Sequence, residues 1–116
     1  MKIQIFEDII AWQKSKELCM ELYKTFKDCK DYSFKDQILR ASISIMNNIA
    51  EGYERNGNRE FRNFLFIAKG SCGEVRSMLY LALELNYITM DEYLKFNKTS
   101  IEISKMASGL IKTLKT

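Results

Sequence analysis

The chain of 116 residues is long enough for one domain and too short for two. It is 47% hydrophobic and 28% charged, which excludes a disordered chain, and the lack of proline disfavours an all-β fold with many tight turns. It has no histidine, which removes the commonest general base and the commonest zinc ligand, so we expect no enzyme, no metal and no cofactor. A net charge of +3 is well below that of a protein that coats DNA.

The first segment with helical periodicity runs from about residue 6 to residue 26. Its apolar residues recur at steps of three and four or their multiples, while lysines and glutamates occupy most of the other face. This pattern predicts an amphipathic helix that is followed by a polar connection over residues 27–32. The apolar positions are Ile9, Trp12, Cys19, Leu22 and Phe26.

The second segment is expected to begin at Ser33, which can cap the helix, and to reach about Glu54. Its apolar residues sweep roughly 200° of the circumference, against about 100° for an ordinary surface helix. A helix this apolar must be covered on two sides, which implies either a central position or a subunit interface. The edge that we assign to a subunit interface consists of Leu39, Ile43, Met46 and Ala50.

Two more helices are predicted after the break at residues 56–58. The third covers about residues 59–85, and its internal Gly70 and Gly73 suggest close approach by a neighbouring helix. The fourth begins at Met90, because Thr89 and Glu92 have the spacing of a capping box. Helices of this length with short connections predict a single all-α domain over residues 1–116, an antiparallel up-down-up-down four-helix bundle that assembles as a homo-oligomer.

The three cysteines are widely spaced, and no CxxC pair exists. This spacing gives little support to zinc or thioredoxin chemistry. Cys19 and Cys72 fall in apolar stripes and are expected to be buried. The odd cysteine count, the early acidic residues and the lack of an apolar run of about 20 residues predict a cytoplasmic protein without a membrane segment.

A basic stripe lies outside the apolar face of the third segment. Arg62, Lys69 and Arg76 are seven residues apart, with Phe66, Gly73 and Tyr80 interleaved. Such a stripe can be a solvated face, a subunit contact in which the arginines meet acids, or a surface for a protein partner. It can also hold single-stranded or looped RNA through phosphate attraction and base stacking. The residues assigned to this RNA site are Arg55, Arg59, Arg62, Phe66, Lys69 and Arg76.

Two other groups of charged residues receive a structural interpretation. Glu51 is the best candidate for a buried carboxylate, and with Arg55 one turn later it is expected to form an ion pair rather than a catalytic group. On the fourth segment, four lysines surround Glu102 on what we interpret as a solvated face. They are Lys95, Lys98, Lys105 and Lys112.

Four stretches of the chain resemble the motifs of one protein family. F-E-D-I-I-A-W-Q-K at 6–14 is similar to F-x-D-L-x-V-W-Q-K, and Q-I-L-R-A-S-I-S-I at 37–45 is similar to Q-L-R-R-A-x-x-S-I. N-N-I-A-E-G-Y-E-R at 47–55 resembles x-N-I-A-E-G-x-x-R, and residues 60–74 resemble E-F-x-x-F-L-x-I-A-x-G-S-x-x-E. The chain therefore resembles the bacterial four-helix bundle proteins encoded in intervening sequences of 23S rRNA genes.

The resemblance implies a homopentamer and an association with RNA or the ribosome. It also implies a fold similar to the accessory variability proteins of diversity-generating retroelements, which bind a reverse transcriptase. The sequence therefore leaves open a non-enzymatic RNA-associated scaffold and a protein adaptor with no nucleic-acid role. The motif residues Asn48, Glu51, Gly52 and Arg55 are expected to organise the end of the second helix and the turn into the third. The family often has a proline near Met46, and this chain has none.

Overall fold

The computed structural model describes residues 2–116, and these residues form long helices and no strand. The predicted all-α fold of four helices is therefore confirmed. A short 3-10 helix, η1 (Phe6–Asp8), is followed by α1 (Ile10–Thr25), α2 (Tyr32–Glu54), α3 (Asn58–Glu84) and α4 (Met90–Thr113). None of the helices in residues 2–116 combines the length and the apolar character that crossing a membrane requires.

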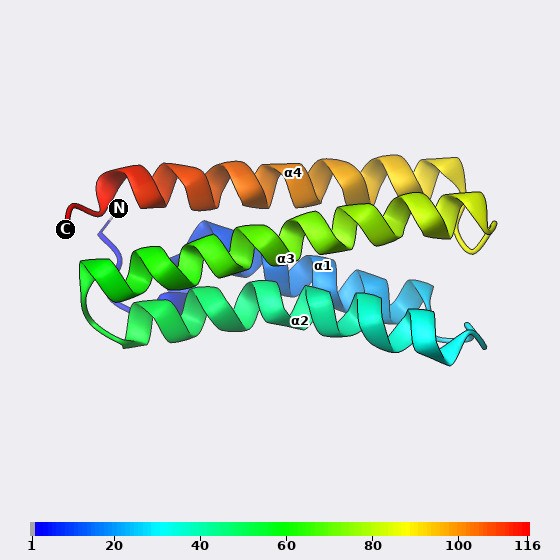
Figure 1. Ribbon diagram of the computed structural model, residues 1–116, viewed down its shortest axis with the longest axis horizontal. Coiled ribbons are helices and arrows are strands. Elements are labelled where there is room, and N and C mark those ends of the chain that lie inside the picture. Colours follow the sequence, from blue (N-terminus) through cyan, green and yellow to red (C-terminus); the bar gives the residue numbers. More distant parts are fainter. Residues whose placement is uncertain (1) are drawn as a thin grey trace.

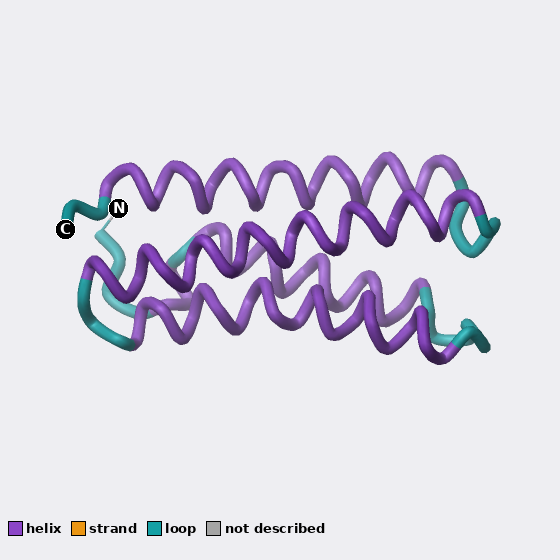
Figure 2. Tube along the Cα trace, viewed as in Figure 1, coloured by secondary structure: helices purple, strands orange, loops and turns teal. Residues whose placement is uncertain are grey.

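The four long helices lie lengthwise beside one another in a bundle of 44 × 22 × 20 Å (Figure 1). The connections between α1 and α2 and between α3 and α4 lie at one end, and the connection between α2 and α3 lies at the other (Figure 2). The two chain ends also lie at this second end. Asn56 and Asn86, at the ends of α2 and α3, have φ values of 57° and 61°. Asparagine accepts this left-handed conformation better than most residues, which lets the chain leave each helix sharply.

The N-terminal helix begins later than predicted. Instead of a helix from Phe6, the chain forms η1, passes through an extended Ile9 and enters α1 at Ile10. The Asp8 carboxylate accepts hydrogen bonds from the backbone N–H groups of Gln4 (3.0 Å) and Ile5 (3.3 Å), which favours a tight turn over a continuous helix. The Phe6 ring packs edge-on against Trp12, with the centroids 5.1 Å apart, and this contact holds the turn on α1.

The cap of α2 differs from the prediction, and the cap of α4 confirms it. The cap of α2 is Asp31 rather than Ser33, because its Oδ1 accepts a hydrogen bond from the Phe34 N–H at 3.2 Å. The other carboxylate oxygen of Asp31 accepts a hydrogen bond of 2.7 Å from the Tyr87 hydroxyl, which joins the two connections at one end of the bundle. At α4 the capping box of Thr89 and Glu92 is present as predicted, with bonds of 2.9 and 3.1 Å.

The core runs the length of the bundle, and α2 is covered mainly from within the subunit. Ile38, Ile45 and Ile49 are inaccessible to solvent, and Leu39 is only 6% exposed. Leu39, which was assigned to a subunit interface, is thus almost fully covered within the subunit, because α1 and α3 together cover most of the broad apolar arc. The other three residues of that edge are half-buried; they are Ile43, Met46 and Ala50.

Most of the buried serine hydroxyls are satisfied within their own helices. The buried hydroxyls of Ser15, Ser42 and Ser100 donate to carbonyl oxygens three or four residues earlier in their own helices, at 2.6, 2.8 and 2.9 Å. Cys19 and Cys72 are buried as predicted and form no disulfide. Burial raises the pKa of the Cys72 thiol to about 12, so this thiol stays protonated at neutral pH.

A close approach between helices occurs at Gly52 rather than at the glycines of α3. A methyl group on Gly70 or Gly73 would meet no neighbouring atom within 4 Å, so the predicted close approach there is wrong. A methyl carbon on Gly52 would lie 2.5 Å from the Phe64 Cβ and 3.2 Å from Phe61 Cδ1. The absence of a side chain at Gly52 is therefore what lets α2 and α3 pack this closely near their connection.

Gly52→Ala is expected to destabilise the fold by about 1–3 kcal/mol, because the added methyl group displaces Phe64 and with it the contact of α2 with α3. Gly70→Ala is the matched control, and it is expected to be neutral or stabilising by up to about 1 kcal/mol, since alanine has the higher helix propensity. Urea unfolding followed by circular dichroism measures both. Equal free energies of unfolding for the two variants would contradict this account of Gly52.

Asp31 is expected to contribute to the pH dependence of stability. The hydrogen bond from Tyr87 and the Phe34 N–H both lower the pKa of Asp31 below its ordinary value of 3.8. Its stabilising contribution is therefore fully present above about pH 4 and is lost as the pH falls through the lowered pKa. Asp31→Asn keeps a capping oxygen but no charge, so its free energy of unfolding should fall less than that of the wild type between pH 5 and about pH 2.

The control for this measurement is Asp36→Asn, at an exposed carboxylate of α2 that accepts no side-chain hydrogen bond in residues 2–116. It should lose stability with acid as the wild type does. An Asp31→Asn variant that follows the wild-type curve throughout would show that the charge of Asp31 does not stabilise the fold.

Candidate functional site

The basic stripe of α3 faces its neighbour α4. The Arg76 Nε donates a hydrogen bond to the Asn97 side-chain oxygen at 3.4 Å. Near the other end of the pair, the Asn58 amide donates to the Lys115 carbonyl at 3.0 Å. The early part of α3 therefore lies beside the late part of α4, and the late part of α3 lies beside the early part of α4.

Arg62 has a structural role that the sequence did not predict. Its guanidinium donates hydrogen bonds to the carbonyls of Ile111 (2.9 Å) and Leu114 (3.1 Å) at the C-terminal end of α4. These carbonyls lie at the end of the helix, where the helix dipole places partial negative charge, and that of Ile111 also accepts the Leu114 N–H at 3.2 Å. Since the guanidinium has five donors, this contact leaves others free, and the group also lies 5.9 Å from the centroid of the Phe66 ring.

The rest of the stripe is accessible and carries uncompensated positive charge. Phe66 and Tyr80 are 51% and 55% exposed, and Lys69 is half-buried. Within residues 2–116 the ion pairs are Lys14 with Glu102, Arg55 with Glu51, and Lys95 with Glu21. Arg62, Lys69 and Arg76 therefore meet no acid within the part of the subunit that the structure describes.

Arg55 directly follows α2, and Arg59, in the first turn of α3, precedes Arg62 by three residues and so lies beside the stripe. Arg55 pairs with the Glu51 carboxylate at 2.8 Å, which raises the pKa of the guanidinium, and it lies 5.2 Å from the centroid of the Phe64 ring. The expected ion pair is thus present, but Glu51 is exposed, so its interpretation as a buried carboxylate is wrong. Arg59 is exposed and forms no ion pair in residues 2–116.

The motif residues of α2 lie on the side that meets α3. The Asn48 amide donates to the Ser44 carbonyl at 2.8 Å and to the Ser44 hydroxyl at 2.9 Å. That hydroxyl is bonded in turn to the hydroxyl of Ser71 on α3 at 2.8 Å. One turn after Asn48, Gly52 packs on Phe64, so a polar contact and a steric contact together position α2 against α3.

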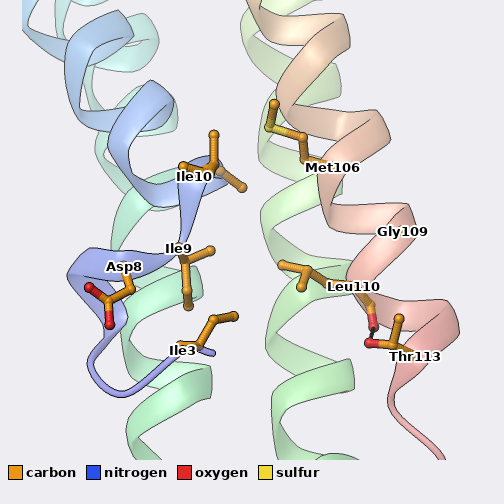
Figure 3. A pocket seen from close by; sticks show the side chains of 9 residues that line it. Ile3, Asp8, Ile9, Ile10, Met106, Gly109, Leu110 and Thr113 are labelled. Carbon is orange, nitrogen blue, oxygen red and sulfur yellow. Dashed lines mark hydrogen bonds between the residues drawn. The ribbon is translucent and has the colours of Figure 1, made fainter. Parts of the chain in front are cut away.

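An apolar hollow of about 530 Å³ lies between the start of α1 and the end of α4. Figure 3 shows Ile9 and Ile10 on one side and Met106 and Leu110 of α4 on the other. Asp8 is the one ionisable residue among those that line it, and its carboxylate is engaged with the backbone of its own turn. The hollow can hold an apolar group, but it presents no pair of groups for acid–base chemistry. Residues 2–116 also contain no group of three or more Cys, Asp or Glu side chains placed to hold a metal ion.

A second apolar surface covers the junction of α1 and α2. Met20 and Tyr23 on α1 are 54% and 47% exposed, and Ile43 and Met46 on α2 are half-buried beside them. Two shallow pockets meet at Tyr23, one lined by Met20 and Met46 and the other by Ile43. We name Met20, Tyr23, Ile43 and Met46 the α1–α2 apolar surface.

The model of the 23S rRNA-intervening sequence protein family matches residues 7–109. The chain belongs to this family. The structure is similar to the crystal structure of a protein of unknown function from the S23 ribosomal protein family of Bacteroides thetaiotaomicron, with a TM-score of 0.82 and 32% identity. That match covers 88% of this chain and 98% of the Bacteroides chain. No curated protein matches the chain.

Proposed function

We propose that this intervening-sequence protein is a non-enzymatic, RNA-associated protein whose antiparallel four-helix subunits assemble into a homo-oligomer. The observation that carries the proposal is the stripe of Arg62, Lys69 and Arg76, which has no acidic partner in residues 2–116 and has an exposed aromatic ring, Phe66, within it. An RNA of the ribosome is the partner that the family's association with 23S rRNA genes favours.

The chemistry of this stripe suits a single strand better than a small ligand. Cations spaced along a helix attract the phosphates of a nucleic acid, and binding releases the counterions that those phosphates held. An exposed ring adds about 1–3 kcal/mol for each base that stacks on it, whatever the base. Because three cations and one or two rings are few, we expect weak, salt-sensitive binding with little sequence preference.

The α1–α2 apolar surface supports self-association in the same proposal. It lies away from the basic stripe, which faces α4, so subunits can meet through it without covering the stripe. We propose the homopentamer that the family resemblance implies, located in the cytoplasm, where the three free thiols stay reduced.

A protein adaptor is the second candidate function, and the apolar hollow beside α4 favours it. Its lining of isoleucine, methionine and leucine side chains suits an apolar segment of a protein, such as a ribosomal protein or a polymerase, rather than a phosphate backbone. In that case the basic stripe would have no direct role with nucleic acid, and removing its charges would leave the partner bound.

The RNA proposal predicts a salt-dependent interaction that Lys69 and Phe66 carry. Fluorescence anisotropy with a labelled, unstructured RNA of 12 nucleotides should give a Kd tighter than about 10⁻⁴ M at physiological salt, weakening as salt rises. The double variant Lys69→Gln, Phe66→Ala leaves the contact of Arg62 with the end of α4 unchanged. It should bind at least about five-fold more weakly than the wild type, since it loses one phosphate contact and one stacking contact. A matched control is Lys24→Gln, Tyr32→Ala, which removes one lysine and one exposed ring elsewhere. An affinity weaker than about 10⁻⁴ M that ignores salt would refute RNA binding.

The oligomer proposal predicts that light scattering gives about five times the subunit mass of 13.6 kDa. Met46→Asp should dissociate the assembly because it places a charge in the apolar contact between subunits, at a position that is only half-buried in the subunit itself. Asn47→Asp, at an exposed neighbouring position, is the control and should keep the assembly. A wild-type monomer at micromolar concentration would contradict the proposal.

A further inference from the structure

The lysines of α4 divide into two groups that the sequence did not separate. Lys95 is bonded to Glu21 on α1 at 2.6 Å, and Glu102 is paired with Lys14 on α1, so both of these α4 residues are turned toward α1. Lys98, Lys105 and Lys112 are all exposed and form no ion pair in residues 2–116. They are spaced seven residues apart, as the three cations of α3 are.

The hydrogen bonds between α3 and α4 show which side of α4 these lysines occupy. Asn97 faces α3, because it accepts the bond from Arg76. Lys98 follows Asn97 by one residue and lies about 100° round the helix from it. The buried Phe96 precedes Asn97 and lies about 100° round the helix in the opposite direction. Lys98 therefore points away from the core into solvent, and Lys105 and Lys112, at about two and four further turns, lie successively about 20° nearer to the side of α4 that meets α3.

The same contacts set the cations of the two helices level with each other. Arg76 is beside Asn97, so Lys98 lies level with Arg76. Arg62 bonds to the carbonyl of Ile111, so Lys112 lies level with Arg62. Lys69 and Lys105 are each midway between these levels. The result is a ladder of three cation pairs with a step of about 10.5 Å, since seven residues of helix rise by this length.

Of the six acidic residues of the two helices, only Glu102 lies among the lysines of the ladder, about 40° round α4 from Lys98, and its carboxylate is paired with Lys14 on α1. Glu74 accepts a hydrogen bond from Gln37 on α2, and Glu92 is engaged in the capping box of α4. Glu60 precedes Arg62 by two residues and lies about 200° round the helix from it. Glu84 and Asp91 lie at the connection of α3 and α4, beyond the last pair of the ladder.

We infer that a single-stranded RNA segment lies lengthwise along the α3–α4 face, with its phosphates held by the six cations of the ladder. They are Arg62, Lys69, Arg76, Lys98, Lys105 and Lys112. The inference rests on the proposed RNA association and adds α4 as half of the site. The ladder is about 21 Å long, which corresponds to about six nucleotides of a stacked strand at about 3.4 Å each.

The aromatic ring within the ladder selects a single strand over a duplex. Phe66 is half-exposed between the first and second cation pairs of the ladder, where it can stack on an unpaired base. In a duplex the base faces are covered by neighbouring pairs and only the backbone and groove edges are accessible, so this ring would contribute nothing to binding.

The test uses the full chain, its wild-type form as reference, and an unstructured RNA of 12 nucleotides with a hairpin of equal length. The variant Lys98→Gln, Lys105→Gln, Lys112→Gln changes only exposed residues of α4. It should lower the slope of log K against log salt by about 2, because each phosphate contact of a single strand contributes about 0.7. Its affinity at low salt should fall by about ten-fold or more. The control variant Lys16→Gln, Lys24→Gln, Lys30→Gln removes three exposed lysines from the α1 side and should keep the wild-type slope.

The outcomes separate this inference from the proposed function. A wild-type chain that binds the single strand, together with an α4 variant that keeps the wild-type slope, would overturn the ladder and leave the proposed function intact. A wild-type chain that binds no RNA would overturn both. Equal loss of slope in the α4 variant and in the α1 control would show a diffuse charge effect and no ladder. Tighter wild-type binding to the hairpin than to the single strand would overturn the assignment of strand type.

Discussion

The contact of Arg62 with the last carbonyls of α4 joins α3 to α4 at one end of the bundle, and the proposed RNA surface depends on it. It neutralises the negative end of α4 and at the same time fixes the lengthwise position of α4 against α3. With Arg76 on Asn97 as the second point, the register of the two helices is set at both ends. The positions of the α4 lysines relative to the α3 stripe, and hence the proposed RNA surface, follow from this register. Arg62 both stabilises the contact of α3 with α4 and contributes positive charge to the surface. A substitution of Arg62 would therefore change stability and RNA affinity together, so the binding experiments leave it unchanged.

Periodicity and capping chemistry were enough to predict most of the fold. The spacing of apolar residues indicated four helices. Thr89 and Glu92 have the residue types and the spacing of a capping box, so the start of α4 could be predicted from these two residues alone. The starts of α1 and α2 could not be predicted in this way. The first depends on the Asp8 carboxylate folding back to Gln4 and Ile5. The second depends on which of two nearby cap residues, Asp31 or Ser33, is used, and Asp31 also accepts a bond from Tyr87, 56 residues away in sequence.

The candidate site was predictable only within one helix at a time. The sequence indicated that Arg62, Lys69 and Arg76 share a face, because that follows from helical geometry alone. It gave no sign that Asn97 meets Arg76, since that contact depends on the register of two helices. For the same reason the lysines of α4 were grouped with Lys95 and Glu102, although both of these turn toward α1. The wide apolar arc of α2 left two interpretations open for a related reason. The arc shows how much surface must be covered, but not whether α1 and α3 or a second subunit covers it.

Both ends of the bundle are closed by polar contacts between segments that are distant in the chain. At one end Tyr87 bonds to Asp31, and at the other Arg62 bonds to the terminal carbonyls of α4. Helical bundles ordinarily open first at their ends, where few apolar contacts oppose local unfolding. Here the start of α2 and the end of α4 must each lose a long-range contact before they can fray, so hydrogen exchange at these two helix ends is tied to breakage of tertiary contacts. The part of the α3–α4 face next to Arg62 therefore keeps its geometry for as long as the end of α4 stays attached to α3.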